Sequence, residues 1–175
     1  MDEIKNIKDA IKTAIQMEKD GYSFYKKAAV QTSNEMGRSI FESLANDELL
    51  HLDVFQKMFQ DNVGEEEWKN LVDSSKKYAN IKIFPKDLKT MEGVNPESDE
   101  MDALRIGMDS EREAIDYYNN ILENITDPDM KNIINEIIEQ EKNHYLILEQ
   151  EFNHLDKTGY WFDMDYLGSY TRGGD

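Results

Sequence analysis

The chain has 175 residues, a length that suits one domain with a substantial hydrophobic core. Its 37 acidic residues outnumber its 20 basic residues, and the net charge of −17 argues against binding to nucleic acid or anionic membranes. The absence of cysteine excludes disulfides, thiolate-bound metals and cysteine nucleophiles, so any metal must be held by carboxylate, imidazole, carbonyl or water. With neither a secretion leader nor a run of about 18 apolar residues, we expect a cytoplasmic protein without a membrane or nucleic-acid partner.

Apolar residues spaced three and four apart predict two long helices at the start of the chain, over about residues 3–32 and 34–60. Thr32 followed by Glu35 is typical of a capping box that starts the second helix. The connection is then only a few residues long, so the two helices should be antiparallel neighbours. The predicted buried positions are Ile4, Ile7, Ile11, Ala14, Tyr22, Tyr25, Ala28, Ile40, Phe41, Leu44, Phe55, Met58 and Phe59.

Residues 61–95 break this periodicity and predict a crossover long enough to return along the bundle, which makes the second and third helices parallel. Asn95-Pro96 is a typical helix start, with an N-cap and a proline at the first helical position. Asp127-Pro128 repeats this signal for the fourth helix, which we expect to end before Gly159. The predicted buried positions are Met101, Leu104, Met108, Ile115, Tyr118, Leu122, Ile125, Met130, Ile133, Ile134, Ile137, Leu148 and Phe152.

Four amphipathic helices predict an all-α protein, with one four-helix bundle over residues 1–162 and a tail over residues 163–175. The aromatic segment Tyr160-Trp161-Phe162 precedes the tail. We expect it to fold back on the bundle or to be buried against a second subunit. Trp161 and Phe162 are expected to serve packing rather than chemistry.

Two Glu-x-x-His pairs occupy helix positions that are otherwise apolar. Glu48 and His51 lie on the predicted second helix, and Glu141 and His144 lie on the fourth. Because residues three apart share one face of a helix, both members of each pair should point at the core. Groups of this kind are rare in a core unless they are paired or bind a metal.

A shift of 93 residues relates the two pairs, and the same shift carries Glu18 onto Glu111. All six residues lie about 15 to 18 positions from a short connection, so they should meet at one height in the bundle. Four carboxylates facing one cavity repel each other, and two divalent cations would cancel their charge. Oxygen-rich donors with two imidazoles suit iron or manganese. The sequence therefore predicts a dinuclear metal centre held by Glu18, Glu48, His51, Glu111, Glu141 and His144.

A third Glu-x-x-His match, Glu151 and His154, lacks this support. The shift of 93 pairs these residues with Met58 and Asp61, and the match lies near a helix end. We interpret it as coincidental and predict that it contributes nothing to the metal centre.

Tyr25 and Tyr118 are related by the same shift and lie two turns beyond Glu18 and Glu111 on the same stripes. Their hydroxyl groups are candidates to hydrogen-bond a ligand carboxylate or to act as redox groups near the metals. The alternative is that both tyrosines only fill the core.

The stretch from Met17 to Ala29, MEKDGYSFYKKAA, resembles the first-helix signature of the rubrerythrin branch of ferritin-like proteins. The segment from Gly159 to Phe162, GYWF, resembles the ending of stand-alone members, so the resemblance covers about residues 3–162. It implies a ferritin-like four-helix bundle and a homodimer. It also implies two iron ions that react with hydrogen peroxide or dioxygen, with manganese or a mixed pair as alternatives.

Two departures from typical rubrerythrins affect the expected function. Those proteins carry a second Glu one turn after the third-helix ligand, used when an iron changes ligands, but this chain has Ala114 there while Glu113 points elsewhere. These residues also contain no cysteine for the usual rubredoxin domain, so we expect electrons to come from an external donor such as a rubredoxin or a reductase. The alternatives are a ferroxidase or iron-storage protein, a di-iron hydroxylase of an organic substrate, and a metal-bound interaction protein without turnover.

Overall fold

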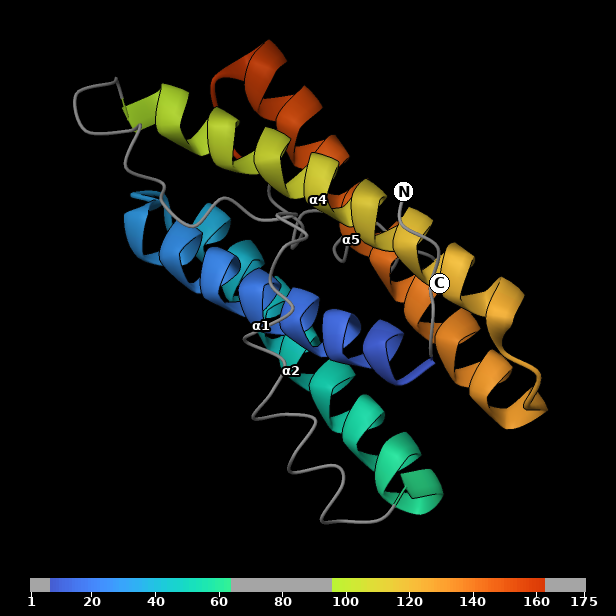
Figure 1. Ribbon diagram of the computed structural model, residues 1–175. Helices are drawn as coiled ribbons and strands as arrows, with labels where there is room; N and C mark the ends of the chain where they lie inside the picture. The colour runs from blue at the N-terminus through green and yellow to red at the C-terminus, as the bar shows by residue number, and fades with distance from the viewer. Residues whose placement is uncertain (1–6, 64–95, 163–175) are drawn as a thin grey trace, which may run out of the picture.

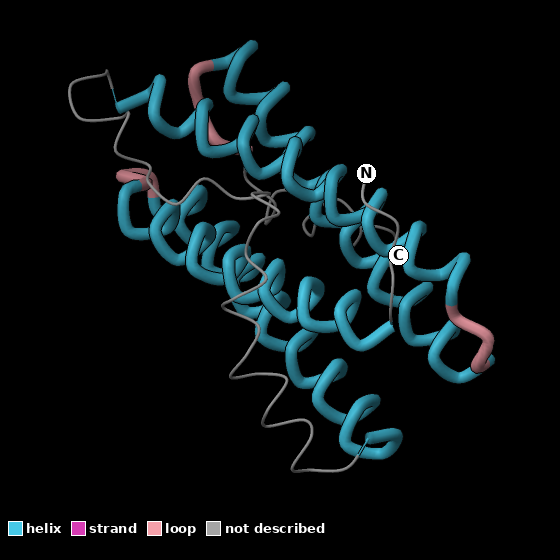
Figure 2. The backbone as a smooth tube through the Cα atoms, viewed as in Figure 1, coloured by secondary structure: helices cyan, strands magenta, loops and turns pink. Residues whose placement is uncertain are grey.

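The computed structural model describes residues 7–63 and 96–162. These ranges contain no strand and form the helices α1 (Ile7–Gln31), α2 (Glu35–Val63), α4 (Pro96–Asn124) and α5 (Pro128–Thr158) (Figures 1 and 2). Residues 61–63, which the sequence assigns to the crossover, belong to α2 instead. The rest of the predicted crossover, residues 64–95, lies outside the described residues, as do the Asn95 cap, the tail at 163–175 and the side chains of Ile4, Ile7, Met58 and Phe59.

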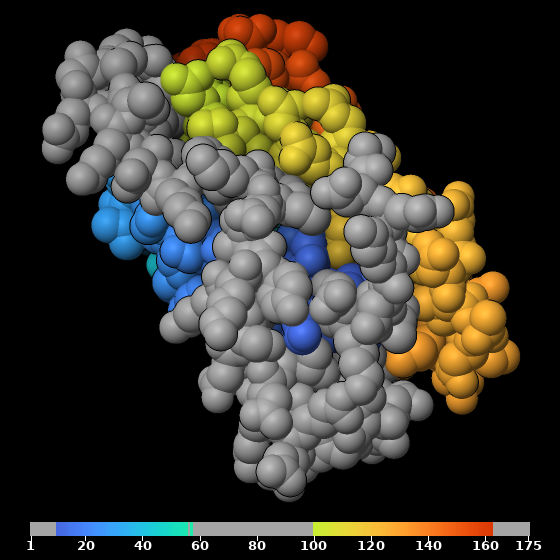
Figure 3. All heavy atoms as spheres, in the orientation of Figure 1, coloured from blue at the N-terminus to red at the C-terminus, as the bar shows by residue number. Residues whose placement is uncertain are grey.

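The helices form two antiparallel pairs that pack into a four-helix bundle. A short connection joins α1 to α2, another joins α4 to α5, and the members of each pair contact each other. α1 also contacts α4, and α2 contacts α5. α2 and α4 run in the same direction (Figure 1), as the long crossover predicts. In the space-filling view, α4 and the end of α5 meet along the upper edge of the molecule (Figure 3). The predicted all-α, ferritin-like bundle is confirmed.

The cap at the start of α2 differs from the prediction, whereas the cap at the start of α5 agrees with it. The predicted capping box at Thr32 is wrong, because the Thr32 hydroxyl donates to the carbonyl of Ala28 at 2.8 Å and still belongs to the end of α1. Asn34 caps α2 instead, accepting from the backbone N–H of Met36 at 2.9 Å. At α5 the prediction is confirmed, since Asp127 accepts from the N–H of Met130 at 2.9 Å.

The C-terminal end of α5 is also as predicted. Gly159 follows the helix with φ 71°, a left-handed conformation that glycine adopts without steric cost. Its backbone N–H donates to the carbonyl of Leu155 at 2.8 Å and closes the last turn. The chain can therefore reverse direction immediately after α5.

The core consists of two apolar clusters, one on each side of the middle of the bundle. The first contains Ile11, Ile15, Phe55, Ile121, Ile125, Ile134, Ile137 and neighbouring residues. The second contains Phe24, Ala28, Phe41, Leu44, Leu104, Leu148, Leu155 and neighbouring residues. Each cluster draws on all four helices. The helix stripes predicted from the sequence therefore meet in the core, and they leave a polar layer between the clusters at mid-height.

Trp161 folds back on the bundle, as expected for the aromatic segment. Its side chain is buried against Phe41, with ring centroids 5.9 Å apart, and a Cβ added at Gly37 would overlap its ring. The indole N–H donates to Oε2 of Glu100 at 2.8 Å, and Oε1 of Glu100 accepts from the backbone N–H of Ser33 at 3.0 Å. One buried carboxylate thus ties the α1–α2 connection and the start of α4 to the chain after α5.

Replacing Trp161 with alanine should lower the free energy of unfolding by about 3 to 5 kcal/mol, because the change leaves a large cavity and an unpaired Glu100 oxygen. The matched control is Tyr160→Ala at a neighbouring aromatic residue that is 76% exposed, with an expected change within about 0.5 kcal/mol. Urea unfolding of both variants measures the difference. Equal effects would show that the docked indole contributes nothing.

Candidate metal centre

The six residues predicted as ligands form the polar layer at the middle of the bundle. α1 and α4 each contribute one carboxylate, and α2 and α5 each contribute a carboxylate and an imidazole one turn apart. All six side chains are buried, with exposed fractions of 3% or less. The apolar clusters above and below exclude water from the layer, so the charges in it must be balanced by each other or by a bound cation. The residues are Glu18, Glu48, His51, Glu111, Glu141 and His144.

The six residues divide into two overlapping groups that could each hold a metal ion. One group consists of Glu18 and His51 together with Glu48 and Glu141, and the other consists of Glu111 and His144 with the same two glutamates. Within each group, one ligand atom of every residue lies within 4.8 Å of the others. We call these groups the His51 subsite and the His144 subsite. Glu48 and Glu141 belong to both, which is the arrangement needed for carboxylates that bridge two ions.

Both histidines turn Nδ1 toward the carboxylates. Nδ1 of His51 lies 3.0 Å from Oε2 of Glu18 and 3.3 Å from Oε1 of Glu141. Nδ1 of His144 lies 3.0 Å from Oε2 of Glu141. The two rings are stacked with centroids 5.6 Å apart. Nδ1 is therefore the nitrogen that each imidazole offers to the shared cavity.

Tyr25 on α1 hydrogen-bonds to a carboxylate of α4, and Tyr118 on α4 hydrogen-bonds to a carboxylate of α1. Neither tyrosine therefore serves only to fill the core. The Tyr25 hydroxyl donates to Oε1 of Glu111, and the Tyr118 hydroxyl donates to Oε1 of Glu18. Burial, and then the charges of nearby glutamates, raises the pKa of both tyrosines well above its usual value. Both hydroxyl groups therefore stay protonated at neutral pH and remain hydrogen-bond donors.

Burial and mutual repulsion keep protons on two of the carboxylates when no metal is bound. Loss of hydration raises the pKa of Glu111 to about 8, and the negative charge of Glu141 contributes to this shift. Loss of hydration also raises the pKa of Glu48, with further contributions from the charges of Glu18 and Glu141. Without metal, bound protons neutralise these two carboxylates, and bound cations would neutralise them instead.

The pKa values of the two imidazoles are also raised, but the cause is the surrounding carboxylates, which act against the effect of burial. Burial lowers the pKa of His144, but hydrogen bonds to Glu111 and Glu141 outweigh burial and raise it to about 10. The pKa of His51 is likewise raised by its carboxylate neighbours against the effect of burial. Burial raises the pKa of Glu141, yet hydrogen bonds from both histidines outweigh it and lower the pKa. The metal-free layer therefore contains two imidazolium ions around an ionised Glu141.

This donor set fits a pair of divalent cations. Binding would displace the protons on Nδ1 of the two histidines and on Glu48 and Glu111, and the two cations would replace positive charge that the protons supply. Carboxylate oxygens and neutral imidazole are ligands that iron and manganese accept.

The metal-free protein should become less stable as pH rises from 6.5 to 8. The pKa of Glu111 is about 8 in the folded chain against an ordinary value of 4.5, and that of His144 is about 10 against 6.5. Both folded values are raised, so each contribution is fully present below the ordinary pKa and is lost as pH rises toward the folded pKa. Each group can contribute up to about 1.4 kcal/mol per pH unit.

Urea unfolding in the presence of a chelator measures this slope. Glu111→Gln, which does not titrate, should have a shallower slope than the unsubstituted protein over the same pH range. A stability that rises between pH 6.5 and 8 would contradict the proton distribution described above.

A small residue on α1 leaves room for the side chain of one candidate ligand. A Cβ added at Gly21 would lie 3.0 Å from Cδ of Glu48, closer than ordinary contacts. The shift of 93 residues places Ala114 at the equivalent position of α4, where typical rubrerythrins carry a further Glu. Ala114 is buried in the first apolar cluster and Glu113 is exposed, so neither adds a carboxylate to the polar layer.

Glu151 and His154 take no part in either subsite, as predicted. The carboxylate of Glu151 accepts from the backbone N–H of Phe162 at 3.1 Å, and the His154 ring packs edge-on against the Phe162 ring with centroids 5.0 Å apart. Burial raises the pKa of Glu151. This third Glu-x-x-His pair therefore helps to hold the segment after α5.

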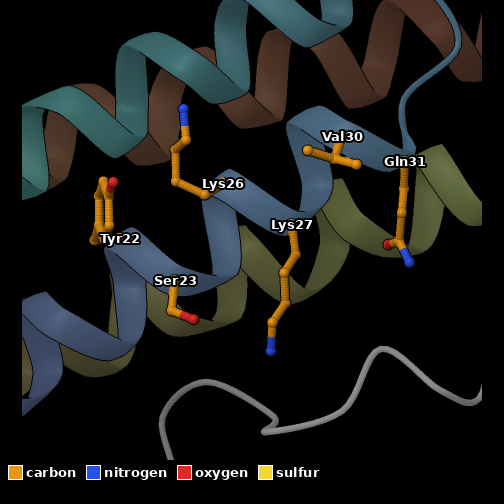
Figure 4. A pocket seen from close by; sticks show the side chains of 6 residues that line it. All are labelled: Tyr22, Ser23, Lys26, Lys27, Val30 and Gln31. Carbon is orange, nitrogen blue, oxygen red and sulfur yellow. The ribbon is translucent and has the colours of Figure 1, made fainter.

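An open hollow on the outside of the bundle is separate from the polar layer. It has a volume of about 440 Å³, and its described lining residues all belong to α1 (Figure 4). The Tyr22 side chain, predicted as a buried stripe residue, is only half-buried and lines this hollow. None of the six candidate ligands lines it. The described lining residues are Tyr22, Ser23, Lys26, Lys27, Val30 and Gln31.

Sequence reasoning missed three polar residues, of which Asp47 and Gln140 contact the polar layer and Glu100 lies at the start of α4. Glu100 was not singled out because a glutamate near a helix start is usually solvated. Asp47 and Gln140 each precede a predicted ligand glutamate and contact a histidine of the opposite pair. Asp47 and Gln140 could have been found from the sequence, because the same shift of 93 residues relates them to each other.

The fold and the polar layer together define a class of protein. A four-helix bundle with an inward Glu on two helices and an inward Glu-x-x-His on the other two is the arrangement of ferritin-like di-metal carboxylate proteins. The family model described as Rubrerythrin matches residues 9–152, and the chain belongs to the rubrerythrin family.

A solved structure agrees with this fold. The structure of a hypothetical protein from Pyrococcus furiosus superposes with a TM-score of 0.68 over 87% of this chain and 92% of that chain. The two sequences are 19% identical, so this similarity concerns the fold alone. A comparison with curated proteins found no match. Of the helices that the structure describes, none combines the length and the apolar character needed to span a bilayer.

Proposed function

We propose that this protein is a non-haem di-iron redox protein that reduces hydrogen peroxide or dioxygen with electrons from an external donor. The observation that carries this proposal is the pair of overlapping subsites, in which Glu48 and Glu141 are common to both. Membership of the rubrerythrin family supports iron as the metal. A manganese or mixed pair has the same donor requirements and is distinguished by elemental analysis.

The six candidate ligands and the two tyrosines each have a role in this proposal. The four glutamates and two histidines would hold the ions. The hydroxyl groups of Tyr25 and Tyr118 would orient two of these carboxylates by donating to Oε1 of Glu111 and Oε1 of Glu18. When bound, a pair of ferrous ions supplies two electrons, which with two protons convert one hydrogen peroxide molecule into two water molecules. The apolar clusters on both sides restrict access of bulk water and of larger molecules.

We further propose that the electrons come from a separate protein, such as a rubredoxin or a reductase. These 175 residues contain no cysteine and therefore no rubredoxin-type iron site of their own. We also propose a homodimer as the assembly. Sedimentation of the purified protein tests this directly, because a dimer of 20.5 kDa chains differs greatly in mass from a cage.

A ferroxidase or iron-handling role is the second candidate, and one observation favours it. Ala114 occupies the position of the extra carboxylate that typical rubrerythrins use when an iron changes ligands. Without that carboxylate, a catalytic cycle based on such a change has no residue to perform it. A many-subunit assembly that retains ferric iron after oxidation would favour this role over the first.

Stopped-flow mixing tests the proposed reaction. Protein loaded with ferrous iron without oxygen is mixed separately with hydrogen peroxide and with dioxygen, and iron oxidation is followed by absorbance. We expect oxidation much faster than that of the same concentration of free ferrous iron in the same buffer. Oxidation no faster than free iron with either oxidant would rule the proposal out.

A further inference from the structure

The two histidines of the polar layer have different partners on their outward nitrogens. Nε2 of His51 lies 3.0 Å from Oε1 of Gln140, a neutral amide. Nε2 of His144 lies 3.4 Å from Oδ2 of Asp47, a carboxylate. Otherwise the two subsites present matching residues, since each adds one Glu and one His to the shared pair. The two subsites therefore differ in the charge of the residue next to the outward nitrogen of the histidine.

These two partners follow from the helix register. Asp47 immediately precedes Glu48 on α2 and reaches across to His144 on α5. Gln140 immediately precedes Glu141 on α5 and reaches across to His51 on α2. Each helix thus supplies the imidazole of one subsite and an outward partner for the histidine of the other.

A metal-bound imidazole needs such a partner. When Nδ1 binds a cation, Nε2 carries the remaining proton and must donate it to an acceptor. The acceptor fixes the orientation of the ring, and a negatively charged acceptor makes the imidazole a stronger donor to the metal than a neutral one does. The charge of Asp47 also attracts a cation directly, although its side chain is 39% exposed and partly screened by water.

We propose that Asp47 and Gln140 are positioning residues that make the two subsites unequal, so that the His144 subsite binds a divalent cation more tightly and fills first. This inference rests on the proposed function, because it concerns ions held by the same six ligands. It goes beyond that function in assigning an order of filling and a cause for it.

Titration of the metal-free protein with Mn²⁺ in the absence of oxygen tests the inequality. Calorimetry gives the two dissociation constants, and electron paramagnetic resonance separates a single bound Mn²⁺ from a coupled pair. We expect two constants that differ by about tenfold or more. Asp47→Asn should weaken the tighter one about tenfold, whereas Gln140→Glu should strengthen the weaker one. A gain of affinity in Gln140→Glu is not expected from a residue with only a structural role.

Single-histidine variants assign each effect to a subsite. In His51→Ala, where the His144 subsite is intact, adding Asp47→Asn should weaken Mn²⁺ binding about tenfold. In His144→Ala, the same addition should change affinity less than about twofold. Asp53→Asn is the matched control, because it removes the same charge from an exposed position on α2. Thermal unfolding of each metal-free variant checks that the fold is retained.

The outcomes separate this inference from the proposed function. Failure of the unsubstituted protein to bind two Mn²⁺ ions would overturn both. Binding of two ions with equal affinity, or an unchanged affinity when Asp47→Asn is added to His51→Ala, would overturn the inequality alone. Weakening of Mn²⁺ binding by Asp53→Asn to the same extent as by Asp47→Asn would replace the proposed contact with a general effect of surface charge.

Discussion

Replacing Glu141 with alanine is expected to abolish tight binding at both subsites. Glu141 belongs to both groups of candidate ligands, and its two oxygens lie 3.3 Å from Nδ1 of His51 and 3.0 Å from Nδ1 of His144. Replacing a ligand of one ion should remove that ion alone, whereas replacing a carboxylate shared by two ions should remove both. We expect affinity for Fe²⁺ or Mn²⁺ to fall by more than about a hundredfold at each subsite.

The same substitution should destabilise the protein with and without metal. In the metal-free chain, Glu141 is the ionised carboxylate that balances two buried imidazolium ions, and breaking a buried pair costs about 3 to 5 kcal/mol. With excess metal, the variant also loses the stabilisation that binding gives to the folded state. The control is Glu139→Ala on the same helix, whose side chain is 69% exposed and pairs with Lys142. If Glu141→Ala still bound two ions, Glu141 would not be shared.

The second large effect is a contrast between two histidines on α5. His144→Ala should remove one metal ion per chain, because it deletes the imidazole of one subsite and leaves the other intact. His154→Ala should leave the metal content unchanged, because His154 packs on Phe162 and belongs to neither subsite.

Elemental analysis of both variants, prepared side by side with the unsubstituted protein, measures the contrast. Because each variant loses a Glu-x-x-His imidazole from the same helix, general effects of shortening a histidine are matched. An equal loss of metal from the two variants would mean that the wrong pair had been identified as ligands.

The fold and the six candidate ligands could be predicted because both follow from helix periodicity. The spacing of apolar residues determines which face of each helix is buried, and Glu48 and Glu141 lie on that face where hydrocarbon is expected. Once the short connections fix the antiparallel pairs, residues at equal distance from them must meet at one height. The internal shift of 93 residues then separates the two pairs that lie in the polar layer from Glu151 and His154.

Contacts between solvated faces could not be predicted in the same way. Asp47 and Gln140 occupy positions that periodicity assigns to the exterior, and only the rotation of α2 against α5 brings them to the histidines. The Glu100–Trp161 hydrogen bond depends on how the chain turns after α5, which spacing along a helix does not determine. The cap of α2 could not be assigned from the sequence, because Thr32 and Asn34 are both good cap residues and the end of α1 decides between them.

The most direct test is the metal stoichiometry of protein purified without oxygen and supplied with ferrous iron. Elemental analysis after removal of unbound metal should give two iron ions per chain, with fewer than one in Glu141→Ala prepared in parallel. A content below one ion per chain in the unsubstituted protein, or an equal content in both proteins, would contradict the dinuclear centre.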